Sequence, residues 1–133
     1  MTRLKEVLDN LYDIPLLKTH IKNDPIEFPH LYDDPKDIEV AGFIASSLAF
    51  GRIGLFKPVI KKILSFADNS LYEYVINFEP HKDKKHFESL YYRMCKGEDL
   101  AALIFILREV IRKHGTIGTL FHSCYNHQTS LRN

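Results

Sequence analysis

Histidine and cysteine are the side chains best suited to bind a metal ion or attack a substrate, and this chain has seven histidines and two cysteines. The closest histidine pairs, His81/His86 and His122/His127, are five residues apart, which places the two rings of each pair on different sides of a helix. The cysteines lack a Cys or His partner at zinc-finger spacing, and Cys95 has no adjacent base. We therefore expect no metal, no cofactor and no complete catalytic centre in these residues.

Basic side chains offer a second chemistry, the binding of phosphate. The 133 residues have a net charge of +1, but the charge is unevenly spread: residues 1–40 carry five basic against nine acidic residues, and residues 41–133 carry thirteen against eight. An excess of this kind can form a local anion-binding face, although solvated helix faces with ordinary surface lysines are the simpler explanation. The candidate phosphate contacts are Arg52, Lys57, Lys61, Lys62 and Arg93.

A polar site is a third candidate, in the proline-containing stretch of residues 24–36. Asp24 and His30 lie there, and side chains in such a connector often fasten a loop to a helix. The functional alternative is that Asp24 and His30 converge with Arg52 and Arg93 on one site. The sequence leaves both possibilities open.

The elements that must position these residues are predicted to be helices. Apolar residues recur at helical spacing in Leu4–Tyr12, residues 16–22 allow a short second helix, and residues 24–36 form an irregular connector. An apolar segment, Ile38–Phe50, follows Asp37, which suits an N-cap, and its small residues indicate a central helix packed closely on several neighbours. The next helix begins near residues 55–57, since Pro58 is best tolerated in a first turn.

The remaining helices are predicted from their caps. Ser70 and Glu73 form a capping-box pattern, Asp83 is expected to cap a helix that ends at Gly97, and Thr116 a last helix to about Tyr125. The strongest helical pattern is residues 100–113. The sequence therefore predicts one all-α domain over residues 1–133, a compact bundle of six to eight helices that is not a coiled coil.

Three blocks of the sequence resemble the signature of a bacterial family, domain of unknown function 2400. They are the blocks at residues 23–30, 37–52 and 92–100. Members of this family are about twice as long, so the resemblance implies that the chain is the N-terminal part of a longer family domain. Met94 and Cys95 depart mildly from the third block, where a Thr-Phe-like pair is common.

A more distant similarity concerns the fold. The segment Asp37–Gly51, the helix after it and the Ser70 cap resemble the opening helices of the helix-hairpin-helix DNA glycosylase superfamily. In that superfamily the DNA-gripping hairpin and the catalytic Asp come later in the chain, and this sequence has no such hairpin. The similarity implies a helical shell without the chemistry.

Two functions are compatible with this sequence. The first is nucleic-acid binding through phosphate contacts, in a protein related to DNA repair. The alternative is a non-enzymatic helical module that binds a protein partner or itself through exposed apolar side chains, for which Tyr91, Tyr92 and Phe121 are candidates. The longest apolar run, residues 100–107, is too short to span a membrane, and no apolar signal segment is visible at the N-terminus, so we expect a cytoplasmic protein without membrane contact.

Overall fold

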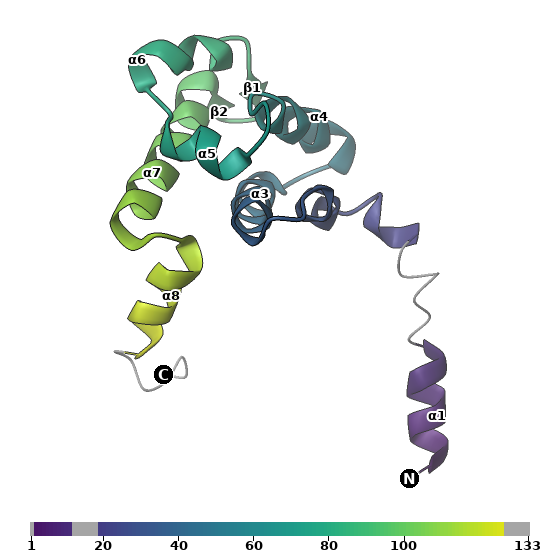
Figure 1. The fold of residues 1–133 in the computed structure, drawn as a ribbon. Helices are drawn as coiled ribbons and strands as arrows, with labels where there is room; N and C mark the ends of the chain where they lie inside the picture. Colours follow the sequence, from purple (N-terminus) through teal and green to yellow (C-terminus); the bar gives the residue numbers. More distant parts are fainter. Residues whose placement is uncertain (1, 12–18, 127–133) are drawn as a thin grey trace.

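The structure is a computed structural model that describes residues 2–11 and 19–126. It confirms the predicted all-α class, because helices dominate and the β-structure is a single two-stranded hairpin in the described residues (Figure 1). The α-helices are α1 (Thr2–Leu11), α3 (Pro35–Leu48), α4 (Ile53–Leu64), α5 (Leu71–Ile76), α6 (Pro80–Asp83), α7 (Gly97–His114) and α8 (Ile117–Asn126). The 3-10 helices are η1 (Pro25–Glu27), η2 (Pro29–Leu31) and η3 (Lys84–Phe87), and the strands are β1 (Tyr91–Tyr92) and β2 (Cys95–Lys96).

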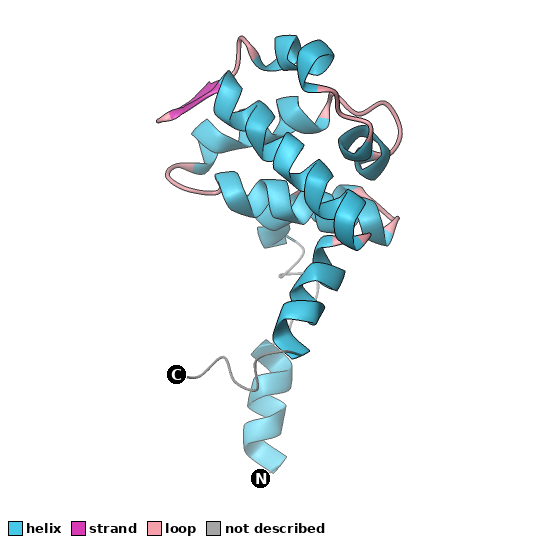
Figure 2. Ribbon diagram, turned by 90° about the vertical axis from the view of Figure 1, so that its left-hand side faces the viewer, coloured by secondary structure: helices cyan, strands magenta, loops and turns pink. Residues whose placement is uncertain are grey.

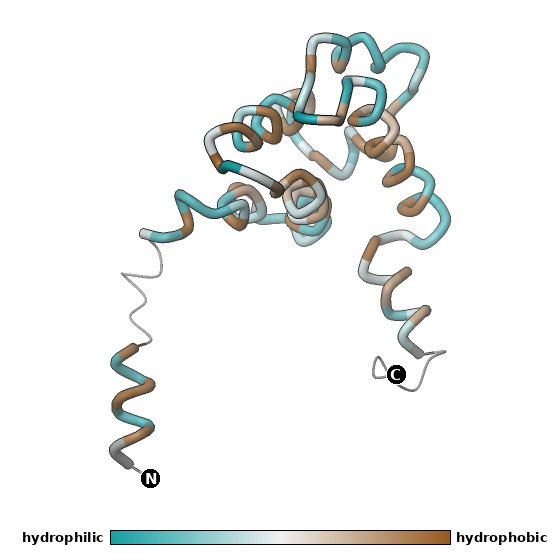
Figure 3. The backbone as a smooth tube through the Cα atoms, turned by 180° about the vertical axis from the view of Figure 1, so that it is seen from behind, coloured by the Kyte–Doolittle hydropathy of each residue, from teal (hydrophilic) through white to brown (hydrophobic). Residues whose placement is uncertain are grey.

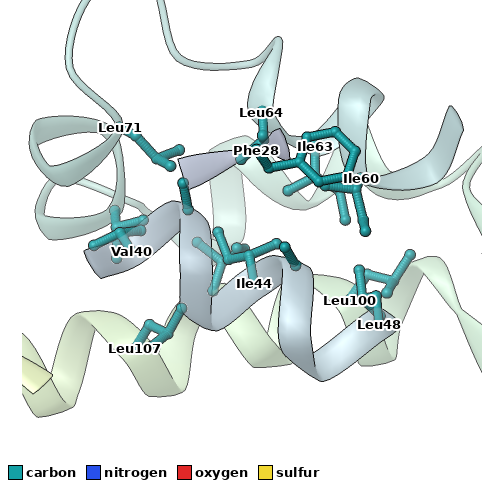
Figure 4. Close-up of a cluster of buried hydrophobic side chains, with 14 of the residues drawn as sticks. Phe28, Val40, Ile44, Leu48, Ile60, Ile63, Leu64, Leu71, Leu100 and Leu107 are labelled. Atoms are coloured by element: carbon teal, nitrogen blue, oxygen red, sulfur yellow. The ribbon is translucent and has the colours of Figure 1, made fainter. Parts of the chain in front are cut away.

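Helix α3 is the centre of the helical body, as its apolar, small-residue sequence predicts. It contacts η1, η2, α4, α5 and α8. Its buried apolar face meets side chains from the other elements in one continuous core, and Figure 4 shows Val40, Ile44 and Leu48 of α3 among them. Burying such side chains contributes roughly 1.5–3 kcal/mol each, so this core is the main source of stability. The labelled partners include Phe28, Ile60, Ile63, Leu64, Leu71, Leu100 and Leu107.

Helix α1 buries none of its large apolar side chains. Figure 3 shows hydrophobic and hydrophilic residues alternating around it, as expected of an amphipathic helix, and Figures 1 and 2 show it apart from the helical body. Its large apolar side chains are exposed: Leu4, Val7, Leu8 and Leu11. The predicted second helix, residues 16–22, lies partly outside the described residues, of which 19–21 are helical.

The start of α3 corrects the prediction about Asp37. The helix begins at Pro35, and Asp34 is its N-cap, because an Asp34 oxygen accepts a hydrogen bond from the Lys36 N–H at 2.8 Å. Asp37 is 7% exposed, and among the described residues it is the one buried charged side chain. Its Oδ1 accepts hydrogen bonds from the Ser70 hydroxyl at 2.8 Å and from the Tyr72 N–H at 2.7 Å. Asp37 therefore caps α5, not its own helix.

Helix α5 is also held at its other end. It has only six residues, too few to be stable alone. The Arg112 guanidinium of α7 donates to the Ile76 carbonyl at 2.8 and 3.1 Å, and Arg108 Nη1 donates to the Phe78 carbonyl at 2.6 Å. We call Asp37, Arg108 and Arg112 the α5 clamp. The clamp satisfies backbone groups that a short helix leaves without partners.

Glu39 of α3 caps a second helix from a distance. Its two carboxylate oxygens accept hydrogen bonds from the Ile117 and Gly118 N–H groups at 3.0 and 2.6 Å. The predicted cap Thr116 also acts, because its hydroxyl accepts a bond from the Thr119 N–H at 3.0 Å. Acidic side chains of α3 therefore fix the N-termini of both α5 and α8, where they also oppose the positive end of the helix dipole.

The segment 83–97 does not form the predicted helix. Pro80 opens the short helix α6, η3 follows, and the chain then forms the hairpin β1–β2. Burial alternates in β1, since Tyr91 is 69% exposed and Tyr92 only 3%, a period of two residues in place of the helical period. After the hairpin the backbone passes close to the backbone of Phe87. This contact requires glycine at position 97, because a Cβ on Gly97 would lie 1.9 Å from the Phe87 carbonyl oxygen.

Two smaller predictions are also corrected. The connector of residues 24–36 contains the 3-10 helices η1 and η2. Helix α4 begins at Ile53, so Pro58 lies inside it and not in its first turn. The carbonyl that loses its partner through this proline is that of Gly54, and Gly54 is exposed, so water can hydrate that carbonyl. No helix of the described residues is long and apolar enough to cross a membrane.

Candidate nucleic-acid interface

Two of the predicted phosphate contacts, Arg52 and Arg93, lie in two turns that contact each other, the turn before α4 and the hairpin loop. Gly51 and Arg52 belong to that turn, and Arg93 lies in the two-residue loop between β1 and β2. Gly51 has φ of 89° and Arg93 has φ of 53°. The left-handed region is ordinary for glycine but costs an arginine roughly 1–2 kcal/mol. The hairpin therefore holds Arg93 in a strained backbone conformation.

Tyr92 fixes the hairpin to this turn. Its hydroxyl donates a short hydrogen bond to the Phe50 carbonyl, and the two rings pack with their centroids 4.9 Å apart. Because a hairpin of two-residue strands is marginal alone, these contacts hold it in place on α4, which β1 also contacts.

The Arg93 guanidinium lies directly against the turn. Its carbon is 5.9 Å from the centre of the Phe50 ring, a cation–π distance. A Cβ built on Gly51 would lie 2.5 Å from Arg93 Nη1 and 3.0 Å from the Tyr92 hydroxyl. Only glycine therefore lets the guanidinium lie at this position, and the positive φ requires glycine for a second reason.

Arg52 places a second positive charge at the start of α4. It is the N-cap residue of α4, it makes no side-chain capping bond, and the first turn contains no acidic residue. Arg52 and Arg93 are both exposed, and neither forms an ion pair within the described ranges 2–11 and 19–126. A helix N-terminus carries partial positive charge and free N–H groups, so it favours anions and disfavours cations. We call Arg52 and Arg93 the arginine pair, and both residues lie beside a helix end that favours an anion.

The three lysines predicted with these arginines are placed differently. The Lys57 ammonium donates to the Glu27 carboxylate and to the Lys22 carbonyl, both at 2.7 Å, and so joins α4 to η1. Lys61 and Lys62 are exposed on α4, and the Lys62 ammonium lies 5.5 Å from the Phe66 ring. Lys57 is therefore occupied by the fold, whereas Lys61 and Lys62 are accessible.

Asp24 and His30 lie on the 3-10 helices. Asp24 is the N-cap of η1, and its Oδ1 accepts a bond from the Ile26 N–H at 2.9 Å. His30 is exposed on η2. Asp24 also lines a cavity of about 370 Å³ between these helices and α3. The other lining residues are mostly small or apolar: Pro25, Ile26, Pro29, Gly42, Ala45, Ser46 and Ala49.

Comparison with known proteins places the chain in a family. Residues 24–133 match the family described as Protein of unknown function (DUF2400). The chain belongs to the DUF2400 family. No curated protein and no solved structure matches it. The arginine pair lies within the part of the chain that matches DUF2400, whereas α1 precedes that part.

The titratable groups of this DUF2400 chain with shifted pKa values lie away from the arginine pair. Burial, and to a smaller degree Asp83, raises the pKa of Tyr74, and the buried Tyr74 hydroxyl has no hydrogen-bond partner in the described part of the chain. A hydrogen bond from Lys82 lowers the pKa of Glu79. Within the described residues, no group of three or more His, Cys, Asp and Glu side chains could hold a metal ion.

The sequence analysis identified Arg52 and Arg93 as candidates, but it did not identify the residues that hold their two turns together. Phe50, Gly51 and Tyr92 build the contact between the two turns. A signal for this contact was present in the DUF2400 blocks at residues 37–52 and 92–100, since each of these two blocks combines an aromatic residue with an arginine. The pairing of two blocks about 40 residues apart is a tertiary contact that a local pattern cannot reveal.

Proposed function

We propose that this DUF2400 chain binds nucleic acid through backbone phosphates at the arginine pair. The observation that carries the proposal is that Arg52 and Arg93, at the N-terminus of α4, have no ion-pair partner in the part of the chain that the structure describes. A phosphate there would meet two guanidinium groups and the free N–H groups of a twelve-residue helix. Lys61 and Lys62 extend the positive charge along α4. Lys57 is assigned to the fold because Glu27 already neutralises it.

The strain at Arg93 supports a functional role for this residue. Glycine or asparagine would occupy a position with φ of 53° at lower cost. A strained conformation that persists beside an uncompensated charge is typical of binding sites. The proposed contact involves phosphates and carries little sequence choice.

A salt titration with matched variants tests the proposal. Binding of a labelled oligonucleotide is followed by fluorescence anisotropy from about 50 mM salt upward, with wild type, Arg52→Gln/Arg93→Gln and a control, Lys85→Gln/Lys113→Gln. The control removes the same charge from exposed residues on η3 and α7. For a duplex, the arginine variant should reduce the slope of log K against log salt by about 2, since each phosphate contact contributes about 0.9. No binding at about 50 mM salt, or an equal effect of the control, would refute the proposal.

The order of elements adds a weaker argument. The proposed resemblance to the helix-hairpin-helix DNA glycosylase superfamily implies an apolar helix, a turn, a basic helix and a short helix, and the order of α3, α4 and α5 is compatible with it. We propose a repair-related role on this basis only. A shared order of helices is an analogy of fold, and function depends on the site.

The second candidate function is self-association or protein binding. It is favoured by the exposed apolar stripe of α1, and by Phe121 and Tyr125 on α8, which are also exposed. Tyr91 is exposed as expected, but Tyr92 is buried and cannot contribute. Sedimentation velocity of wild type and Leu4→Ser/Leu8→Ser tests this function. A monomer at all concentrations, with no change in the variant, would contradict self-association.

A further inference from the structure

The hairpin that contains Arg93 displays a second set of side chains on its other face. Tyr91 is paired with Lys96 across the hairpin, and Tyr92 with Cys95. Successive side chains of a strand point to opposite faces, so Tyr91 and Lys96 project from the face opposite the buried Tyr92. Met94, 75% exposed, lies beside Arg93 in the loop. Figure 2 shows the hairpin at the edge of the helical body, and Tyr91 is 69% exposed there.

We infer, on the basis of the proposed function, that Tyr91 stacks on an unpaired base and that the ligand of this interface is single-stranded nucleic acid. An exposed aromatic ring beside cations is the arrangement that binds single strands, because the ring stacks on a base while the cations bind phosphates. Here Tyr91 is directly across the hairpin from Lys96, which supplies the neighbouring cation, and Arg93 follows two residues later in the same hairpin. In a duplex, interior bases are already stacked on both faces, so the ring would have no base face to contact.

The hairpin presents Tyr91 on a rigid base. Tyr92 anchors one strand to Phe50. The other strand leads directly into α7, whose first residue, Gly97, lies tightly against the Phe87 backbone. Little backbone freedom is therefore lost when a base binds, which favours affinity. An exposed tyrosine on a mobile loop would not have this advantage.

The test compares wild type with Tyr91→Leu and Tyr91→Phe. Leucine keeps an apolar side chain but removes the ring, whereas phenylalanine keeps the ring. Phe121→Leu, which removes a similarly exposed ring from α8, is the matched control. The probes are a labelled single strand of about 15 nucleotides, the duplex of the same sequence, and a strand of the same length in which the central nucleotides are abasic. Circular dichroism checks that each variant is folded.

We expect wild type to bind the single strand more tightly than the duplex. Tyr91→Leu should weaken single-strand binding about 5- to 150-fold, the range reported for loss of one stacked base. The slope against salt should be unchanged, since no charge is lost. Tyr91→Phe and Phe121→Leu should bind like wild type, and the effect of Tyr91→Leu should disappear with the abasic strand.

The outcomes separate this inference from the proposed function. If binding depends on the arginine pair but Tyr91→Leu binds as wild type, or if the duplex is preferred, the stacking inference is wrong and phosphate binding stands. An equal loss on normal and abasic strands also overturns stacking. If wild type binds no probe, both proposals fall.

Discussion

Replacing Asp37 tests whether the most buried charge of the described residues supports the fold. Asp37→Ala would leave the Tyr72 N–H without its acceptor and remove one bond of the Ser70 hydroxyl. Hydrogen bonds to a charged group contribute about 1.5–3 kcal/mol each, and a buried donor left unpaired adds a desolvation cost. We expect a loss of about 3–5 kcal/mol in the free energy of unfolding, a large part of the 5–15 kcal/mol typical of a domain.

Asp37→Asn should be milder. The amide keeps an oxygen at the position of Oδ1, so both hydrogen bonds can persist without the charge. We expect a loss of about 1–2 kcal/mol. The control is Asp34→Ala, which removes an exposed cap of α3 and should cost about 0.5–2 kcal/mol, typically about 1.

Urea denaturation followed by circular dichroism measures these differences. A double-mutant cycle with Ser70→Ala isolates the Asp37–Ser70 bond, because the two side chains should couple by more than about 0.5 kcal/mol. If Asp37→Ala is no less stable than Asp34→Ala, the carboxylate does not support α5. If Asp37→Ala folds normally yet loses nucleic-acid binding, Asp37 belongs to the binding site and our structural assignment is wrong.

Two further predictions concern Arg93 and Tyr74. Arg93→Gly should be about 1 kcal/mol more stable than Arg93→Ala, because glycine adopts φ of 53° without strain. The two variants should lose oligonucleotide binding equally. Equal stability of the two variants in urea would show that the turn stores no strain. Tyr74→Phe should raise stability at pH 7 by about 1 kcal/mol, since it removes a buried hydroxyl that has no hydrogen-bond partner among the described residues. Because folding raises the pKa of Tyr74 above its unfolded value of about 10, wild type should lose stability as the pH rises past 10. Tyr74→Phe should lose less in urea titrations at pH 7 and 10.5, and an equal loss in both proteins would contradict the role of this hydroxyl.

Local patterns predicted the elements whose caps lie next to them in sequence. Helix α7 and the Ser70 cap of α5 were found because their signals are a few residues apart. The hairpin was missed because its determinants are distant: Tyr92 bonds to Phe50, 42 residues away, and Gly97 packs on Phe87. Asp37 was correctly identified as a cap, but for the wrong helix, because its partners lie 33 and 35 residues along the chain.

The candidate site was likewise predictable only in part: its residues could be named, but not how they are arranged. Arg52 and Arg93 were named from residue type and from the DUF2400 blocks, but nothing local indicates that they meet. Lys57 was also predicted to bind phosphate, but the fold occupies its charge, because Lys57 forms an ion pair with Glu27, 30 residues away in the sequence. Charge and spacing indicate which side chains could bind an anion, whereas tertiary contacts decide which remain free to do so.

The α5 clamp has a consequence for how the molecule opens. Helix α5 has too few turns to persist alone, and both its ends depend on side chains of α3 and α7. Its backbone amides should therefore exchange with solvent deuterium at the same slow rate as those of α3 and α7, since α5 can open only when the contacts between all three helices are lost. This six-residue helix thus reports the global unfolding of the bundle.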